Sequence, residues 1–351
     1  MRAMAVQDYG RPLELLDLPA PEARPGHALL EVVACGVCYS DVKISRGKMP
    51  FSETLPLPHV PGHEICARVL ACDPPVFEPG SLVLVYHIFP CGRCGRCRAG
   101  AENLCVAPEA TVGFTHHGGF QERLVAPVDR LLPVPRGIDA LQATTLTCGL
   151  GTAYRAVATR GEIRPGRTAV VIGLGGVGLS ALQVARAGGA RAFGLDVSER
   201  AVGVARELGL DALRGDDPAA EAHILRVTEE GVDVVVDVVG RPETVAQACR
   251  LVRPGGRIVG VGYSLTAEVV LPAARSVLEE VEWVGSRYAR RDELARAISL
   301  VADGYVRTLV DSVRPLEEVN EAFTALESGD VTGRVVIDVA GVQDGAGRPA
   351  A

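Results

Sequence analysis

Four of the ten cysteines lie close together in the chain and could bind a metal ion. They are Cys91, Cys94, Cys97 and Cys105, with the spacing C-x2-C-x2-C-x7-C. Four thiolates on a glycine-rich loop can form a closed tetrahedral zinc site, with no position left for a substrate. Bacterial iron–sulfur sites have a shorter last gap followed by proline, whereas here Val106 follows. The spacing therefore favours a structural zinc, and an iron–sulfur cluster or four independent thiols stay as the alternatives.

Three further segments carry residues that could bind a second metal ion or move protons. They are Cys35-Gly36-Val37-Cys38-Tyr39-Ser40-Asp41, Pro61-Gly62-His63-Glu64 and Thr147-Cys148-Gly149-Leu150-Gly151-Thr152. Each segment alone is weak evidence, because a lone cysteine is usually a small core residue and a lone histidine is more often a hydrogen-bonded polar group.

A glycine-rich turn follows the apolar run 168–172 and opens a helical pattern. It reads Gly173-Leu174-Gly175-Gly176-Val177-Gly178 and fits G-x-G-x-x-G, in which a pyrophosphate binds at the helix N-terminus. Asp196 ends the next apolar run, where a carboxylate could bind the ribose hydroxyls and repel a 2′-phosphate. The set predicts NAD rather than NADP, and a glycine-rich turn without a nucleotide is the alternative. Arg200 could pair with the ribose or with Asp196, or be a solvated arginine.

The elements that must position these residues fall into two kinds. Up to about residue 148, short apolar runs are interrupted often by proline and glycine, which is typical of an antiparallel barrel or sandwich. Beyond residue 164, strand and helix patterns alternate, which predicts a parallel sheet with helices on both faces. The predicted strands are 168–172, 192–195, 232–236 and 257–261, the helices 177–187 and 198–208. Helical patterns at 292–302 and 316–327 and a strand at 334–338 follow.

Length and composition limit the classes of protein to consider. The chain has 351 residues, which suggests about two domains, and 48% of them are hydrophobic. The formal net charge of -7, without a basic stripe, argues against a nucleic-acid partner. No stretch approaches the roughly 20 apolar residues of a membrane helix, and the start lacks the apolar core of a signal peptide. We therefore expect a cytoplasmic protein with no membrane partner, in which clustered cysteines indicate metal or redox chemistry.

Taken together, these motifs resemble the medium-chain zinc alcohol dehydrogenase family over nearly the whole chain. The matching set, in the family's order, is Gly62-His63-Glu64, the cysteine lobe, Gly118-Gly119-Phe120, the glycine-rich turn and Arg253-Pro254-Gly255-Gly256. The resemblance implies an α/β fold with two domains. A GroES-like β-barrel catalytic domain would comprise residues 1–149 and 287–351, and a doubly wound parallel-sheet Rossmann domain, residues 150–286, would bind NAD. The active site would lie between them.

The resemblance also implies roles for residues of the three segments. Cys38, His63 and Cys148 would be the protein ligands of a catalytic zinc. Glu64 would be the nearby carboxylate that approaches the metal during ligand exchange. Asp41 would be the acid that orients His63.

Other implied roles concern the proton and the nicotinamide. Ser40 would accept the substrate proton, and Thr152 would pack against the nicotinamide. Many members have a histidine that ends the proton relay where this chain has Lys43, so whether Lys43 or bulk water takes over stays open, as does the role of Tyr39. Polyol-type relatives often have glutamate in place of Cys148, which favours the simple-alcohol branch modestly.

These observations predict a zinc-dependent oxidoreductase that transfers a hydride between NAD and a primary or secondary alcohol, or the matching aldehyde or ketone. It would bind two zinc ions per chain and act as a homodimer or homotetramer. The alternatives are a polyol or sugar dehydrogenase of the same superfamily and, from a different class, a redox-inert protein that binds NAD and zinc. Zinc-free quinone-reductase-like relatives lack the cysteine lobe.

Overall fold

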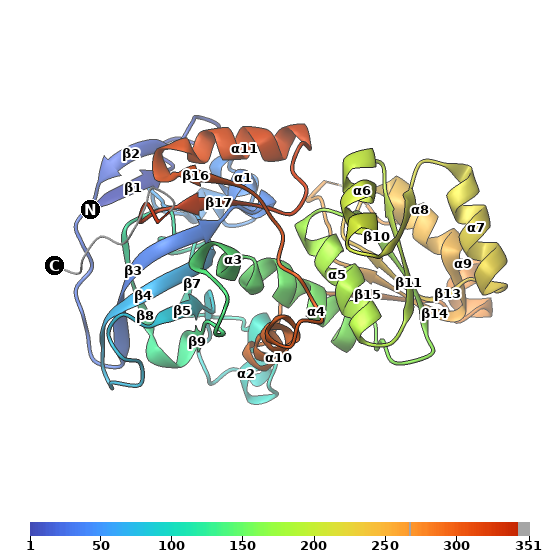
Figure 1. Cartoon of the computed structure of the whole chain (residues 1–351), viewed down its shortest axis with the longest axis horizontal. Coiled ribbons are helices and arrows are strands. Elements are labelled where there is room, and N and C mark those ends of the chain that lie inside the picture. The colour runs from blue at the N-terminus through green and yellow to red at the C-terminus, as the bar shows by residue number, and fades with distance from the viewer. Residues whose placement is uncertain (267, 343–351) are drawn as a thin grey trace. The chain divides into compact units, whose positions relative to one another are not determined.

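The computed structural model of the protein describes residues 1–266 and 268–342. The chain folds into two compact units (Figure 1). The first consists of Met1–Cys148 and Thr308–Ala351, and the second of Gly149–Arg307. Among the helices of the described residues, none is both long and apolar enough to cross a bilayer.

The first unit is built on a seven-stranded sheet in the order β16-β17-β3-β4-β5-β9, with β8 pairing with β3. Apart from the parallel pair β16 and β17, its strands pair antiparallel, and two small two-stranded sheets, β1-β2 and β6-β7, accompany it. The strands are β1 (Arg2–Ala5), β2 (Glu14–Asp17), β3 (His27–Gly36), β4 (Glu64–Cys72), β5 (Leu82–Val85), β6 (Ile88–Phe89), β7 (Ala110–Thr111), β8 (Arg123–Pro127), β9 (Leu131–Pro133), β16 (Val310–Pro315) and β17 (Arg334–Asp338).

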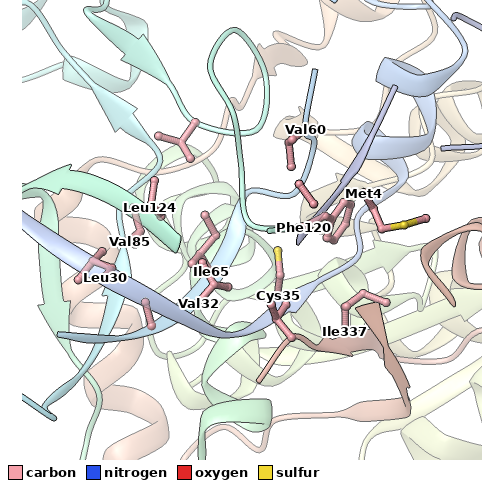
Figure 2. Close-up of a cluster of buried hydrophobic side chains, with 14 of the residues drawn as sticks. Met4, Leu30, Val32, Cys35, Val60, Ile65, Val85, Phe120, Leu124 and Ile337 are labelled. Atoms are coloured by element: carbon pink, nitrogen blue, oxygen red, sulfur yellow. The ribbon is translucent and has the colours of Figure 1, made fainter. Parts of the chain in front are cut away.

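Helices of the first unit are short, apart from α11. They are α1 (Tyr39–Ser45), η1 (Ser52–Thr54), α2 (Gly95–Arg98), η2 (Glu102–Leu104), η3 (Val128–Arg130), α3 (Ala140–Thr144), η6 (Leu316–Glu318) and α11 (Val319–Ser328). The core of this unit is a cluster of buried side chains from β3, β4, β5 and β17 (Figure 2). Cys35 and Phe120 belong to it, and both are fully buried. This core holds the ends of β3 and β4, where Cys38 and His63 lie.

The second unit contains a six-stranded parallel sheet in the order β12-β11-β10-β13-β14-β15. Its strands are β10 (Thr168–Ile172), β11 (Arg191–Asp196), β12 (Asp211–Arg214), β13 (Val232–Asp237), β14 (Val252–Gly260) and β15 (Glu282–Gly285). Its helices are α4 (Gly151–Tyr154), η5 (Arg155–Arg160), α5 (Gly176–Ala187), α6 (Glu199–Glu207), α7 (Pro218–Thr228), α8 (Pro242–Leu251), α9 (Ala273–Leu278) and α10 (Arg291–Ala302). A π-helical segment, η4 (Leu146–Leu150), spans the boundary of the units.

The strand order of this sheet reverses between β10 and β13, which is the switch point at which doubly wound sheets bind dinucleotides. Side chains of α7 and α8 pack on one face in a buried cluster with Phe193 and Leu195. Gly194 points to the other face, where Leu182 of α5 lies so close that no side chain would fit. The prediction of a doubly wound sheet with helices on both faces is confirmed.

The compact units differ from the predicted domains at residues 287–307. The prediction grouped these residues with the barrel, whereas contacts group them with the second unit. The physical reason is a buried ion pair within that unit. Arg155 Nη1 donates to both carboxylate oxygens of Glu293 at 2.8 Å, and Thr159 Oγ1 donates to Glu293 Oε1 at 2.7 Å. Glu293 is 1% exposed, so α10 is held against η5 by a desolvated charge pair.

Removal of this pair should destabilise the second unit. We expect Arg155→Met to lower its free energy of unfolding by about 3 kcal/mol, because the buried Glu293 carboxylate loses its closest cation and keeps only the more distant Arg290 guanidinium at 3.5 Å. Fluorescence of Trp283, the single tryptophan, reports on this unit during urea unfolding. Arg296→Met is the matched control, since its pair with Asp292 is exposed and should contribute about 1 kcal/mol or less. If both substitutions lowered the free energy of unfolding equally, the buried pair of Arg155 and Glu293 would not be the stabilising contact.

Candidate metal centres and dinucleotide site

Asp41 connects two segments of the first unit that are far apart in the sequence. It is the third residue of α1 and is fully buried. Its Oδ2 accepts the backbone N–H of Cys38 at 2.9 Å, and its Oδ1 accepts the N–H of Gly62 at 3.1 Å and Nδ1 of His63 at 3.0 Å. Because Nδ1 donates to Asp41, the Nε2 lone pair of His63 is free to bind a metal ion.

The turn that carries His63 is fixed by close backbone contacts. Gly62 has φ of +97°, and a side chain there would meet Cys35 and Phe120. A Cβ at Gly118 would collide with the carbonyl oxygen of Gly62, to which Gly119 donates its N–H at 2.7 Å. Gly118 and Gly119 can therefore lie against the backbone of Pro61 and Gly62, because the glycines have no side chains.

Four potential metal ligands converge in the first unit. One ligand atom from each of Cys38, His63, Glu64 and Cys148 lies within 4.8 Å of every other one. Nε2 of His63 is buried and has no hydrogen-bond partner among the described residues. A buried nitrogen without a partner is costly, so this atom requires a ligand, and zinc suits two thiolates and an imidazole. The structure thus brings the three predicted ligands of the catalytic zinc together.

The electrostatics of this cluster also favour a cation. A hydrogen bond with Cys148 holds the pKa of Cys38 well below its usual range, while the same bond and burial raise the pKa of Cys148 far above it. The second thiol therefore resists ionisation beside the first, and a divalent cation would favour both thiolates. Burial opposes protonation of His63, but the charge and hydrogen bond of Asp41 outweigh it and raise the pKa of the ring.

Glu64 has a partner that sequence reasoning missed. Its Oε2 lies 3.0 Å from Nε of Arg334, the first residue of β17, and both side chains are buried. Burial raises the pKa of Glu64 to about 7 against the opposing charge of Arg334. No motif marks Arg334 in the sequence. It reaches the cluster because β17 pairs antiparallel with β3, with Val336 opposite Gly36. A side chain at Gly36 would collide with Glu64.

Ser40, Lys43 and Tyr39 lie on α1 beside this cluster. Ser40 Oγ is 3.8 Å from Cys38 Sγ. The ammonium group of Lys43 lies 5.9 Å from the centre of the Tyr39 ring. Burial lowers the pKa of Lys43, and the nearby Cys38 opposes this shift. Tyr39 is exposed, so its ring is available to a ligand.

The cysteine lobe forms a second convergent set in the first unit. Sγ atoms of Cys94 and Cys97 are 3.5 Å apart, those of Cys91 and Cys105 are 3.5 Å apart, and Cys94 and Cys105 are separated by 4.0 Å. Sulfurs bound to one tetrahedral zinc at about 2.3 Å would be roughly 3.8 Å apart. The spacing therefore fits one zinc ion held by all four thiolates.

The pKa values of two of these thiols are shifted in opposite directions. Backbone N–H groups of Val106 and Cys97 lower the pKa of Cys94 to about 6. Desolvation and neighbouring thiols raise the pKa of Cys97 to about 12. A bound divalent cation would lower the pKa of both thiols, since zinc stabilises thiolates.

The glycine-rich turn joins β10 to α5 at the switch point of the second unit. Gly173 has φ of +93°, and a Cβ at Gly178 would collide with the carbonyl oxygen of Gly173. Gly175, the N-cap of α5, differs because a Cβ there would meet no protein atom. Its open space, together with the N–H groups of Gly176 and the residues after it, fits a pyrophosphate.

The other predicted cofactor residues also lie in the second unit. Asp196 ends β11, and its Oδ2 accepts the N–H of Leu174 in the glycine-rich turn at 2.5 Å. Its Oδ1 accepts the N–H of Ser198 at 2.8 Å, so the carboxylate is fixed beside the turn. Arg200 follows on α6. Thr152 is buried on α4.

Comparisons with known proteins agree with this geometry. Two family models match the sequence: an alcohol dehydrogenase GroES-like domain over residues 24–136, and a zinc-binding dehydrogenase domain over residues 176–303. An alcohol dehydrogenase of Geobacillus stearothermophilus is 32% identical over 96% of this chain and 98% of that protein. An NAD-dependent alcohol dehydrogenase of Sulfurisphaera tokodaii is 34% identical over 96% and 99%. A crystal structure of an NAD-dependent alcohol dehydrogenase, 32% identical, has a TM-score of 0.89 and covers 97% and 100%.

Substitution of Asp41 should weaken zinc binding at the His63 centre and leave zinc binding by the cysteine lobe unchanged. We expect about two zinc ions per chain in the unaltered protein. Asp41→Asn should weaken binding at the His63 centre by about 10- to 100-fold, because the imidazole loses the carboxylate that orients it. Zinc content after dialysis against graded chelator measures this. Asp129→Asn, on the exposed η3, is the control. Unchanged zinc retention in Asp41→Asn would contradict the role of Asp41.

Proposed function

Because the chain belongs to the medium-chain zinc-dependent alcohol dehydrogenase family, we propose that it transfers a hydride between NAD and a primary or secondary alcohol, or the matching aldehyde or ketone. The observation that carries the proposal is the convergence of Cys38, His63 and Cys148 within ligand distance of one another. The unpartnered Nε2 of His63 supports it. The small-molecule substrate of such an enzyme would bind beside these three residues.

In the proposed catalytic centre, Cys38 Sγ, His63 Nε2 and Cys148 Sγ hold the zinc. Zinc at an open site supplies Lewis acidity toward an alcohol or carbonyl oxygen, and NAD supplies the hydride acceptor or donor. Glu64 lies in the same cluster, where Arg334 holds its carboxylate in place. The cysteine lobe of Cys91, Cys94, Cys97 and Cys105 would hold the second zinc as a closed structural site.

Protons would leave the substrate through side chains of α1. Ser40 Oγ would accept the substrate proton and pass on its own, and its distance of 3.8 Å from Cys38 Sγ supports this role. Lys43 is one candidate for the end of this relay, since burial lowers its pKa and so makes the ammonium group a better proton donor. Asp41 keeps His63 in the tautomer that leaves Nε2 open.

The second unit would bind NAD. The turn from Gly173 to Gly178 would receive the pyrophosphate, and Asp196 would accept hydrogen bonds from the adenosine ribose hydroxyls. Arg200 would lie near the same ribose, and Thr152 would pack against the nicotinamide. We keep the proposed functional division into a catalytic domain of residues 1–149 and 287–351 and an NAD-binding domain of residues 150–286.

The proposal also covers the oligomeric state of the protein and its place in the cell. We propose a homodimer or homotetramer in the cytoplasm that binds neither nucleic acid nor membranes. β15 is an edge strand, and unpaired strand edges are ready to pair with another chain. Val277 and Leu278 of the preceding α9 expose 73% and 81% of their surface. Sedimentation equilibrium measures the assembly, and a monomer at all concentrations would contradict it.

Loss of one catalytic ligand should abolish activity without unfolding the protein. The unaltered protein with NAD and an alcohol should produce NADH, and Cys38→Ala should lower kcat by about a thousandfold or more, because the zinc site loses a ligand. Cys249→Ala, a buried cysteine of the second unit, is the matched control. An unaltered protein that binds zinc and NAD but oxidises no alcohol would favour the redox-inert alternative. Preference for polyols would favour the polyol dehydrogenase alternative.

The carboxylate of Asp196 should decide between NAD and NADP. Asp196→Asn keeps a hydrogen-bond acceptor for Leu174 but removes the charge that repels a 2′-phosphate. We expect the ratio of kcat/KM for NAD to that for NADP to fall by about tenfold or more. Asp211→Ser, at the opposite end of the adjacent strand β12, is the control. An unchanged ratio would show that another group selects the cofactor.

A further inference from the structure

A buried carboxylate that the proposed function does not use lies at the end of β13. Asp237 is the last residue of this strand, and its side chain is fully buried. In the parallel sheet it pairs with Ile172 of β10 on one side and with Gly260 of β14 on the other. Asp237 therefore lies at the carboxyl edge of the sheet, beside the switch point at which a dinucleotide would bind.

Both carboxylate oxygens of Asp237 accept hydrogen bonds from residues that follow β13. Oδ1 accepts the N–H of Val239 at 2.9 Å and the N–H of Gly240 at 3.0 Å. Oδ2 accepts the hydroxyl of Thr244, in the first turn of α8, at 2.8 Å. Because an unpaired buried carboxylate would be costly, these three bonds stabilise one conformation of the loop between β13 and α8.

The main chain of Asp237 connects this loop to the loop after β14. Its carbonyl oxygen accepts the N–H groups of Val261 and Gly262, at 2.9 and 3.2 Å. Gly240 has φ of +71°, and a Cβ there would collide with the carbonyl oxygen of Gly262. The two loops therefore pack backbone against backbone, and the bond from Gly240 to the carboxylate helps to fix this contact.

The loop after β13 also packs against the glycine-rich turn. A Cβ at Gly173 would collide with methyl groups of Val238 and Val239, so these side chains lie directly against the first glycine of the turn. The N–H of Val238 donates to the carbonyl oxygen of Ile172 at 3.0 Å. The carboxylate of Asp237 thus fixes the segment that places two side chains beside the site proposed for the pyrophosphate.

The two halves of the sheet would bind different parts of NAD. A dinucleotide binds across the switch point, so the half with Asp196 would bind the adenosine, and the half formed by β13, β14 and β15 would bind the nicotinamide nucleoside. The bond between Leu174 and Asp196 holds the glycine-rich turn from the adenosine side. The carboxylate of Asp237 acts from the other side, where the nicotinamide would lie.

We propose that Asp237 is a positioning residue of the dinucleotide site, which holds Val238 and Val239 where the nicotinamide half of the cofactor binds. The inference rests on the proposed function and adds a residue to its cofactor site. In this role Asp237 touches neither cofactor nor substrate, because its carboxylate is buried beneath the loop that it organises. Loss of the carboxylate should therefore weaken binding of the whole dinucleotide, whereas an adenosine nucleotide should still bind.

Binding of NADH and of ADP to the full chain tests this role. Asp237→Ala should raise the dissociation constant for NADH by about tenfold or more, because two buried N–H groups and a hydroxyl lose their acceptor. The dissociation constant for ADP should change by about twofold or less, since the adenosine half of the sheet is unaltered. Fluorescence titration with NADH and calorimetry with ADP measure the two constants.

A conservative variant and a matched control separate positioning from stability. Asp237→Asn should bind NADH within about threefold of the unaltered protein, since its amide oxygen can still accept the N–H groups of Val239 and Gly240. Asp233→Ala is the control at the opposite end of β13, where Oδ2 of Asp233 accepts the N–H and the hydroxyl of Thr168 at 2.7 and 2.9 Å. It loses comparable bonds and should leave both dissociation constants within about twofold, because dinucleotides bind at the carboxyl edge of the sheet.

Several results would overturn the proposal. An unchanged dissociation constant for NADH in Asp237→Ala would show that the loop keeps its conformation without the carboxylate. An equal loss of NADH and ADP binding, or the same loss in Asp233→Ala, would show that the substitution only disturbs the second unit as a whole. If the unaltered protein bound neither nucleotide, the proposed NAD site itself would be refuted, and this inference with it.

Thr244→Val carries the test if Asp237→Ala does not fold. Valine keeps the shape of threonine but removes the hydroxyl that donates to Oδ2 of Asp237. This variant should raise the dissociation constant for NADH by about three- to fivefold and leave that for ADP unchanged, because one of three donors to the buried carboxylate is lost. An unchanged dissociation constant for NADH in Thr244→Val would overturn the proposal.

Discussion

The buried carboxylate of Asp41 is the interaction on which the candidate catalytic centre depends. It receives three hydrogen bonds, from the backbone of Cys38, the backbone of Gly62 and the ring of His63. A carboxylate in the interior is stable only when such donors surround it. These bonds join the end of β3 to the start of β4, so two ligands that are 25 positions apart in the sequence share one site.

Charge balance explains the surroundings of this carboxylate. Asp41, Glu64 and two ionised cysteines would place several negative charges in one buried cluster, which is strongly unfavourable unless cations offset them. Arg334 supplies one positive charge from β17, and a divalent metal ion would supply two more. The residues of the cluster therefore make sense as a set only when a metal ion belongs to it. In the second unit, by contrast, glycines determine the geometry of the site. Gly173 and Gly178 allow a tight turn, and Gly175 leaves space beside it for a ligand.

The sequence predicted those parts of the structure that local patterns determine. The strands 168–172 and 334–338 have the predicted bounds, and the helix predicted at 177–187 begins one residue earlier. The cysteine spacing and the ordered motifs predicted both ligand sets that the structure brings together. The spacing of the four cysteines is a local signal, whereas the catalytic ligand set followed from the resemblance to the family.

Interactions between segments that are distant in the chain could not be predicted from the sequence. Arg334 pairs with Glu64 only because β17 lies beside β3, and no spacing marks that contact. Strand β12 and helices α7 and α8 were not predicted, although tertiary packing places them in the sheet and on its face. The contact between the rings of His87 and Phe114 is a further example, because β6 and β7 must pair before these two residues can meet.

Anomalous diffraction at the zinc edge, on crystals of the protein as purified, tests the central claim most directly. The account predicts a peak bound by Cys38 Sγ and Cys148 Sγ at about 2.3 Å and by His63 Nε2 at about 2.0–2.1 Å, with Asp41 still bonded to the other ring nitrogen. A zinc-replete crystal in which those three atoms share no peak, while the cysteine lobe has one, would contradict it.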